Sequence, residues 1–221
     1  MRHTLTLFLA VAAALPTFAQ TAQHHHQAEK LHRDPKAYIA ALENPKRDAY
    51  QKPDEVMAAL GLRQGEIVAD IGSGSGYFTL RLAQAVGPSG RVYGVDVSPD
   101  MIVHLNRRLR DLGVRNVTTI LAAPDDPFLP DAAIDRFFFC DVWHHVDDQP
   151  KYLASMKRML KPGGQVVMID FHKKPLPVGP PLEMKIARED LVAQMQKHGY
   201  KLVKEHTFLP HQYFIVFEVA S

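Results

Sequence analysis

The sequence predicts an α/β fold in which helices flank a mostly parallel β-sheet, and two observations carry this prediction. From residue 67 onward, short apolar runs alternate with helix-like segments, a pattern typical of strand–helix–strand units. The first run, Ile67–Ile71, leads into a loop that holds Gly72, Gly74 and Gly76. Glycine has no Cβ and reaches backbone angles closed to other residues, so a ligand can approach the main chain there. We therefore expect a nucleotide-binding loop between this strand and the next helix.

The spacing of the loop argues against a dinucleotide. A dinucleotide fingerprint has Gly or Ala three residues after its second glycine, and here Tyr77 occupies that position. The loop instead reads D-x-G-x-G-x-G from Asp70 to Gly76. The next apolar run ends in Asp96, about 20 residues beyond the loop, where an acid can accept hydrogen bonds from both hydroxyls of a ribose. Asp96 is therefore the candidate ribose-binding residue.

The alternation of helices and strands continues from Asp96 to the end of the chain. Ser98 and Pro99 mark a helix start and Gly113 its end, as capping preferences predict. The run IDRFFFCD from residue 134 is apolar enough for a strand that is buried on both faces. The last two strands are joined by a short Leu-Pro-His connection and predict a hairpin. We expect further helices over residues 99–112, 150–160 and 188–197, and strands over residues 67–71, 91–96, 117–121, 134–141, 165–171, 200–208 and 212–219.

Composition and charge narrow the class of protein. Hydrophobic residues make up 46% of the chain and charged residues 23%, as in a soluble globular domain. The formal net charge of +2 gives no reason to expect a nucleic-acid partner. Cys140 is the only cysteine, which excludes an internal disulfide. The sequence contains no feature that sets the oligomeric state.

Three segments precede the expected nucleotide-binding domain, residues 62–221. Residues 1–19 combine Arg2, an apolar run and small residues around a cleavage point after Ala19, which predicts a signal peptide, export to the periplasm or beyond, and no stable membrane span. A misassigned start codon would instead leave the protein in the cytoplasm. Residues 20–33 form a polar linker with imidazoles at His24–His26, but no Cys or acid completes a convincing metal site. Residues 34–61 predict a helical cap, broken at Pro45 and Pro53.

Four features in sequence order resemble the class I S-adenosylmethionine-dependent methyltransferases. They are the D-x-G-x-G-x-G loop, Asp96, the strand before His144 and His145, and the LKPGG turn at residues 160–164. The resemblance covers residues 54–219 and is strongest to the ubiquinone/menaquinone C-methyltransferase-like group and to predicted exported methyltransferases. It implies a Rossmann-like three-layer sandwich with a seven-stranded, mostly parallel sheet in the order 3-2-1-4-5-7-6, strand 7 antiparallel. It also implies S-adenosyl-L-methionine as cofactor, held by Asp70, Gly72, Ser73, Gly74, Gly76, Asp96 and Asp125.

The chain departs from that family after its third strand. Related enzymes carry an acid there that contacts the adenine amino group, whereas this chain has Ala123, followed by Asp125 and Asp126. Either Asp125 takes the hydrogen bond through a shifted loop, or backbone and apolar contacts alone hold the base. Because Pro124 and Pro127 restrict the loop and lack N–H donors, we expect Asp125 to contact the adenine.

The expected reaction makes modest chemical demands. Methyl transfer from a sulfonium is an in-line displacement, so the protein chiefly aligns the reactants, and a base is needed only if the acceptor must lose a proton. Ligands of parallel sheets bind at the carboxyl ends of the strands. The candidate catalytic residues at these ends are His145, His144, Asp141 and Asp170, with His172 nearby. We rank His145 first. We expect a small-molecule acceptor.

Two other functions are compatible with parts of the sequence. The chain could be an exported non-catalytic nucleotide- or metal-binding protein on a methyltransferase fold, since the cofactor has no obvious supply outside the cytoplasm. An NAD(P)-linked oxidoreductase would share the glycine loop and Asp96, but Tyr77 and the terminal hairpin oppose it.

Overall fold

The computed structural model describes residues 34–220. The expected signal peptide, residues 1–19, and the polar linker with His24–His26 lie outside the described residues and stay predictions. Among the described residues, no helix has both the length and the apolar character needed to cross a bilayer.

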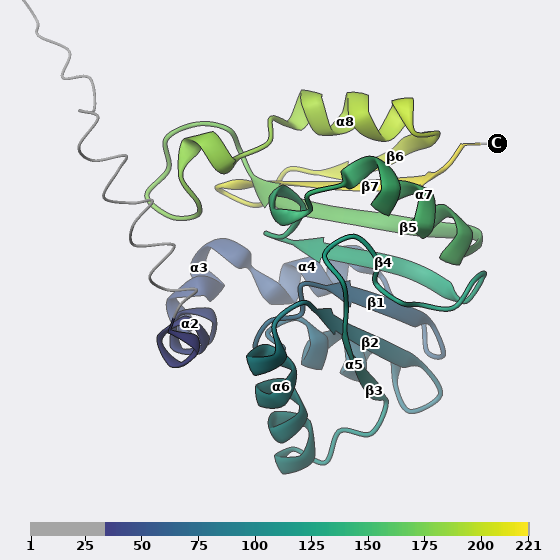
Figure 1. Cartoon of the computed structure of the whole chain (residues 1–221). Helices are drawn as coiled ribbons and strands as arrows, with labels where there is room; N and C mark the ends of the chain where they lie inside the picture. The colour runs from purple at the N-terminus through teal and green to yellow at the C-terminus, as the bar shows by residue number, and fades with distance from the viewer. Residues whose placement is uncertain (1–33, 221) are drawn as a thin grey trace, which may run out of the picture.

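Seven strands of the described chain form one sheet with the order β3-β2-β1-β4-β5-β7-β6, which confirms the predicted topology. Strands β1 to β5 pair in parallel, and β7 is antiparallel to both β5 and β6. The carboxyl ends of the parallel strands therefore lie at one edge of the sheet (Figure 1). The strands are β1 (Ile67–Ile71), β2 (Arg91–Asp96), β3 (Val117–Leu121), β4 (Ile134–Cys140), β5 (Leu160–Phe171), β6 (Tyr200–His206) and β7 (Gln212–Val219).

Helices cover both faces of the sheet, which makes the fold a three-layer sandwich. The helices that pack on the sheet are α4 (Pro53–Leu60), α5 (Thr79–Val86), α6 (Pro99–Asp111), α7 (Gln149–Met159) and α8 (Arg188–Lys197). Helices α7 and α8 bury Leu153, Met156 and Leu191 with Phe137 and Phe139 on one face. Helices α4 and α5 bury Val56 and Leu82 with Phe138 and Phe214 on the other. Neighbouring residues of β4 thus enter opposite cores, as expected for a strand buried on both faces.

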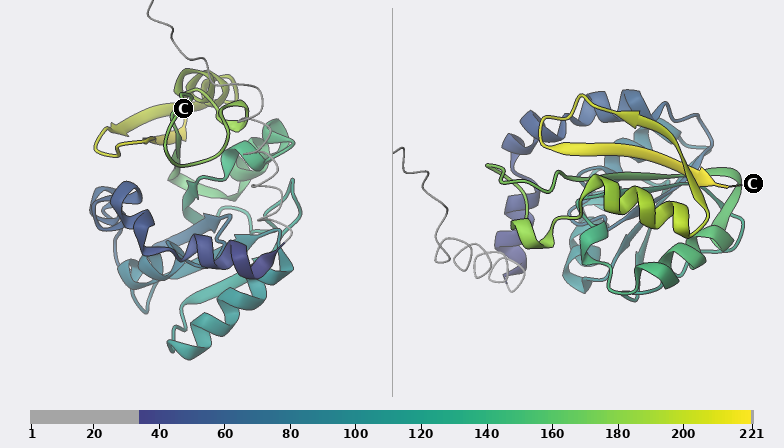
Figure 2. Two further views of the ribbon diagram at one scale, coloured as in Figure 1. Left: turned by 90° about the vertical axis from the view of Figure 1, so that its left-hand side faces the viewer. Right: turned by 90° about the horizontal axis from the view of Figure 1, so that it is seen from above.

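The segment before β1 covers the carboxyl ends of the parallel strands (Figures 1 and 2). It consists of α2 (Pro35–Leu42), a 3-10 turn η1 (Pro45–Arg47) and α3 (Asp48–Gln51), followed by α4. Asp34 caps α2 by accepting hydrogen bonds from two backbone N–H groups, and Pro45 and Pro53 open new helical pieces because proline fits a first helical turn. Residues 35–51 are called the cap.

Some element boundaries differ from the sequence prediction. Strand β5 begins at Leu160 rather than at residue 165, so the LKPGG segment is part of the strand. Leu160 pairs with Ile134 of β4, and the register shifts before Arg136 pairs with Gln165. This pairing joins residues far apart in sequence, and local pattern does not reveal it. Strand β4 ends one residue early, at Cys140, and β6 ends at His206 rather than at Phe208.

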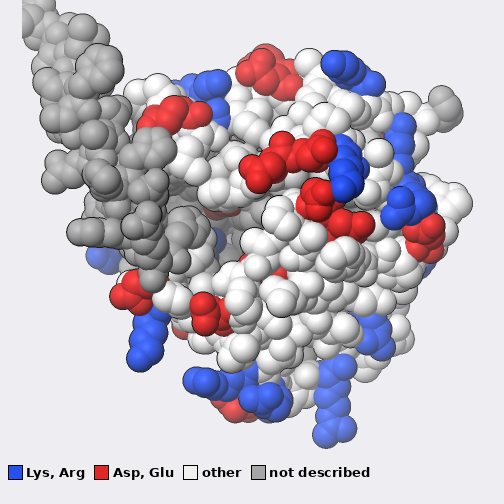
Figure 3. Space-filling view, in the orientation of Figure 1, with Lys and Arg blue, Asp and Glu red and all other residues white. Residues whose placement is uncertain are grey.

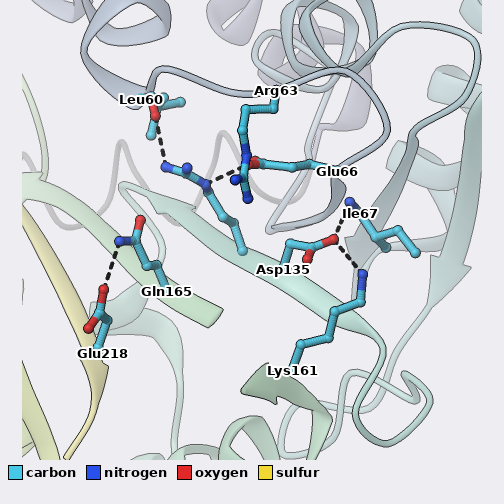
Figure 4. A network of polar contacts seen from close by, with 9 residues as sticks. Leu60, Arg63, Glu66, Ile67, Asp135, Lys161, Gln165 and Glu218 are labelled. Atoms are coloured by element: carbon cyan, nitrogen blue, oxygen red, sulfur yellow. Dashed lines mark hydrogen bonds and ion pairs between the residues drawn. The ribbon is translucent and has the colours of Figure 1, made fainter. Parts of the chain in front are cut away.

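A polar network fastens the amino ends of the strands, at the edge opposite the cap (Figure 4). The buried Glu66 carboxylate forms ion pairs with Arg63 at 2.9 Å and with Arg136 at 3.1 Å. Asp135 accepts hydrogen bonds from the Ile67 N–H at 2.8 Å and from the Lys161 ammonium at 2.7 Å. Because these groups satisfy one another, we assign the network to stability.

The charged surface is mixed. On the face shown in Figure 3, Lys and Arg side chains are interspersed with Asp and Glu, and no continuous patch of one sign forms on it among the described residues. This distribution agrees with the small formal net charge of +2.

Candidate functional site

The glycine loop is tied to the end of β2 and has no room for side chains. The N–H groups of Gly72 and Ser73 both donate to the Val95 carbonyl, at 2.8 and 3.0 Å. Gly72 and Gly74 have φ angles of +69° and +51°, which side-chain-bearing residues rarely adopt. A Cβ on Gly72 would lie 2.3 Å from the Val142 side chain, and one on Gly74 would lie 3.1 Å from Leu42 of the cap. This backbone cradle is thus closed to any Cβ, because Val142 and Leu42 already occupy the space that a Cβ would take.

Asp96 lies beside this cradle at the carboxyl end of β2. One carboxylate oxygen accepts from the Gly74 N–H at 2.8 Å, and the other accepts from the Ser98 N–H at 2.9 Å. Burial raises the pKa of Asp96, and the backbone hydrogen bonds from Ser98 and Gly74 partly oppose that shift. The backbone N–H of Val97 also acts on this carboxylate. Because an ionised carboxylate can accept about four hydrogen bonds, Asp96 retains capacity for a ribose hydroxyl.

Two other residues of the predicted cofactor set lie beneath the loop rather than on its surface. Asp70 is only 3% exposed and accepts a hydrogen bond from the Thr79 hydroxyl at 2.6 Å, so it supports the start of α5. The Ser73 hydroxyl is buried and has no hydrogen-bond partner among the described residues. A Cβ on Gly94 of β2 would lie 3.5 Å from this hydroxyl. The structure thus brings Asp70 and Ser73 to the loop, with their side chains directed inward.

The buried position of Asp70 predicts a pH-dependent stability. Burial raises the pKa of Asp70 from 3.8 to about 7, against the hydrogen bond from Thr79. Between those two values the folded chain holds a proton that the unfolded chain releases, so this group's contribution to stability falls as pH rises through the window. Asp70→Asn removes that loss and keeps an acceptor for Thr79. We compare the free energy of unfolding of Asp70→Asn with that of wild type at each pH. This difference should favour the variant more at pH 8 than at pH 5, by on the order of 2 kcal/mol. Urea unfolding at both pH values measures this difference, and an equal effect at both would contradict it.

The expected adenine loop places Asp125 at the surface. Asp125 forms an ion pair with Lys151 of α7, and its side chain is 40% exposed. The hydrogen bond from Lys151 lowers the pKa of Asp125. Asp126 instead accepts from the Phe128 N–H at 2.8 Å, and Ala123 and Asp126 are joined by a backbone bridge. Val97 and Phe128 are 57% and 59% exposed, so both apolar and acidic groups lie near the ends of β2 and β3.

A second polar cluster lies at the end of β4. Asp141 has a φ of +60°, and both of its carboxylate oxygens are taken by side-chain amides. Oδ2 accepts from Gln51 of the cap, and Oδ1 accepts from Gln212 of β7, both at 2.6 Å. Burial and the neighbouring Asp170 carboxylate raise the pKa of Asp141. Asp141 therefore joins the cap, β4 and β7 at one point.

His144 and Asp170 form a buried pair next to Asp141. His144 Nδ1 lies 2.9 Å from Asp170 Oδ2, and the two side chains are 3% and 2% exposed. Burial lowers the pKa of His144, but the hydrogen bond and charge of Asp170 outweigh it, so the net pKa is raised. With Nδ1 held by the carboxylate, Nε2 is the ring nitrogen through which His144 can take up a proton.

The other predicted histidines are placed differently. His145 is exposed, and its ring centroid lies 4.2 Å from that of His144. His172 packs edge-on against Tyr213, at 5.9 Å between centroids, and burial lowers its pKa. Of the four candidate catalytic residues, the structure groups His144, Asp141 and Asp170, whereas His145 flanks this group on its exposed side.

Sequence reasoning missed three residues of this region. Gln51 and Gln212 hold Asp141, and Tyr38 of α2 lies within electrostatic reach of both clusters. Burial raises the pKa of Tyr38, and the charges of Asp96 and Asp141 add to this shift. Of these three residues, only Gln212 could have been placed near the site from the sequence. In the predicted topology, the first residue of the antiparallel β7 lies beside the carboxyl end of β5. Among residues 34–220, no group of three His, Cys, Asp or Glu residues could hold a metal ion.

Comparison with known proteins agrees with this fold. A family model described as a methyltransferase domain matches residues 62–207. The ubiquinone/menaquinone biosynthesis C-methyltransferase of Pasteurella multocida is 37% identical over 114 residues, which cover 51% of this chain and 42% of that protein. The alignment with these curated relatives therefore spans less than half of their length.

Solved structures share the whole fold. The structure of a SAM-dependent methyltransferase from Aquifex aeolicus superimposes with a TM-score of 0.80 at 26% identity, covering 85% of this chain and 99% of that one. A DhpI–SAH complex superimposes with a TM-score of 0.65 at 21% identity, covering 91% and 96%. At 21% identity, the similarity to the DhpI–SAH complex shows a shared fold and nothing more.

Proposed function

The chain belongs to the methyltransferase domain family, with the fold of the class I S-adenosylmethionine-dependent methyltransferases, and we propose that it methylates a small-molecule acceptor. One observation carries the proposal. The glycine cradle with Asp96 and the buried His144–Asp170 pair lie at the same edge of the sheet, at the carboxyl ends of parallel strands. Open α/β sheets bind their ligands at this edge.

The residues around the loop fit S-adenosylmethionine. The glycine loop presents backbone that carries no side chains at Gly72 and Gly74, and Asp96 has unused acceptor capacity for the ribose. When bound, S-adenosylmethionine supplies an electrophilic methyl group on sulfur. The cap lies over the loop through the contact of Leu42 with Gly74, which suits it to exclude water from the site.

The His144–Asp170 pair supports a role in proton removal. Asp170 orients the imidazole and stabilises its charged form, so His144 Nε2 can accept a proton from the acceptor as the new bond forms. This role suits an acceptor that must lose a proton, such as a phenol, an enol or an amine. Since the curated relatives are named as C-methyltransferases, we favour carbon as the methylated atom.

Calorimetric titration tests the cofactor assignment against the oxidoreductase alternative. We expect S-adenosylmethionine and S-adenosylhomocysteine to bind the protein and NADH not to bind. Binding of NADH with exclusion of S-adenosylhomocysteine would overturn the proposal.

The adenine contact gives a separate prediction. We expect Asp125→Asn to weaken S-adenosylhomocysteine binding by about fivefold, because a hydrogen bond to a neutral amide oxygen is weaker by about 1 kcal/mol than one to a carboxylate. Asp126→Asn is the matched control, because an asparagine oxygen can still accept from the Phe128 N–H, and its affinity should stay within about twofold. Equal affinities in both variants and wild type would mean that apolar contacts hold the adenine.

A further inference from the structure

Gln212 holds a buried hydrogen-bond acceptor that nothing in the described chain satisfies. Its side chain is 1% exposed, and its Oε1 has no partner among the described residues. Buried acceptors of this kind are rare in folded proteins, because losing water without gaining a donor is unfavourable. Such an atom therefore points to a donor that is not part of the chain.

The orientation of the Gln212 amide is fixed by its other end. Nε2 donates to Asp141 Oδ1 at 2.6 Å. With Asp141 ionised, a flipped amide would put two oxygens against each other, so Oε1 is the group left over. Asp141 is in turn held from the opposite side by Gln51 of the cap. Gln51 and Asp141 thus act as positioning residues for the free oxygen of Gln212.

The position of Gln212 is that of an acceptor-recognition residue. It is the first residue of β7 and pairs with Phe171, the last residue of β5. Its hydrogen bond to Asp141, whose pKa the Asp170 carboxylate helps to raise, connects it to the His144–Asp170 pair. The nearby groups are aromatic: Tyr50 of the cap lies 5.9 Å from the Phe171 ring and 6.5 Å from the His211 ring, between centroids. Gly179 of the 172–181 loop packs on Phe171 so closely that a Cβ there would lie 2.7 Å from the ring. Aromatic side chains clustered on Phe171, the cross-strand partner of Gln212, suit a ring that carries a donor.

We propose that Gln212 is a specificity-determining residue whose Oε1 accepts a hydrogen bond from a ring hydroxyl of the methyl acceptor. The inference rests on the proposed methyltransferase function and adds the class of acceptor, a hydroxylated ring. A ring whose hydroxyl is replaced by a methyl ether has the same flat surface but no donor. It would leave Oε1 unsatisfied, and sites built to bond a hydroxyl discriminate strongly against analogues that lack it.

Calorimetry on the full-length protein saturated with S-adenosylhomocysteine tests this with two probes, 2-naphthol and 2-methoxynaphthalene. We expect wild type to bind 2-naphthol at least about tenfold more tightly. Gln212→Leu should reduce the preference to less than about threefold, while affinity for S-adenosylhomocysteine is unchanged. The matched control is Gln165→Leu, which removes an amide that also donates to a carboxylate, that of Glu218, at the far end of the β5 and β7 ladder. This control should keep the full preference.

Each other outcome is decisive. Equal binding of the two probes by wild type, or binding of neither, would overturn the inference and leave Oε1 to an ordered water. A preference that survives in Gln212→Leu would overturn it as well. If Gln212→Leu does not fold, the ratio of the wild-type affinities for 2-naphthol and 2-methoxynaphthalene still tests whether the site requires a ring hydroxyl. Failure of S-adenosylhomocysteine itself to bind would instead remove the proposed function.

Discussion

Asp96→Ala is expected to weaken S-adenosylhomocysteine binding by about 1.5 to 3 kcal/mol, or roughly ten- to a hundredfold. The substitution removes the expected hydrogen-bond acceptor for the ribose. It also releases the Gly74 N–H and the Ser98 N–H from the carboxylate, so the glycine loop loses its connection to the start of α6. Calorimetric titration measures the change in affinity directly.

Asp100→Ala provides the control for this experiment. Asp100 is an exposed acid in the first turn of α6, so its loss changes the net charge equally without touching the loop. Its affinity should remain within about twofold of wild type, as for an ordinary surface substitution. Equal affinities of Asp96→Ala and wild type would remove Asp96 from the cofactor site.

His144→Ala is expected to lower the rate of methyl transfer by about 10²- to 10⁴-fold, the range for losing a positioned general base. Affinity for S-adenosylhomocysteine should stay within about twofold, because His144 lies at the end of β4 and not at the glycine loop. His198→Ala, at the end of α8, removes a histidine of the same kind away from the site and should keep the wild-type rate. An unchanged rate in His144→Ala would show that the acceptor needs no base from this residue.

The pH profile of the same variants separates catalysis from structure. Because Asp170 raises the pKa of His144, the transfer rate of wild type should fall as pH drops through that raised value. Asp170→Asn takes away the stabilising charge, so the acid limb of the profile should move to lower pH. A purely structural role would lower the rate at every pH without moving the limb.

The fold could be predicted because its signals are local. The strand at Val117–Leu121 and the helix at Arg188–Lys197 have the predicted bounds, since turn residues and glycines delimit them. The start of β5 was missed because its first residues become a strand only by pairing with Ile134 of β4. Such a pairing depends on tertiary context rather than on local propensity.

In the candidate site too, some residues are marked by local sequence patterns, whereas others are brought together only by tertiary contacts. The glycine loop and Asp96 are recognisable because each follows a strand in a short, characteristic spacing. The amides that hold Asp141 come from positions 90 and 71 residues away in sequence, and no motif marks them. The pairing of His144 rather than His145 with Asp170 likewise depends on how the 3-10 turn at Trp143–His145 directs each ring.

Transfer of a labelled methyl group tests the proposed methyltransferase activity most directly. Full-length protein is incubated with S-adenosylmethionine carrying a ¹³C-labelled methyl group and with a small-molecule metabolite extract, and the products are followed by mass spectrometry. We predict that the label appears in a small molecule while S-adenosylhomocysteine accumulates in equal amount, and that both signals drop in His144→Ala. Binding of the cofactor without label transfer or S-adenosylhomocysteine formation would contradict the proposed activity and leave a non-catalytic binding protein on a methyltransferase fold.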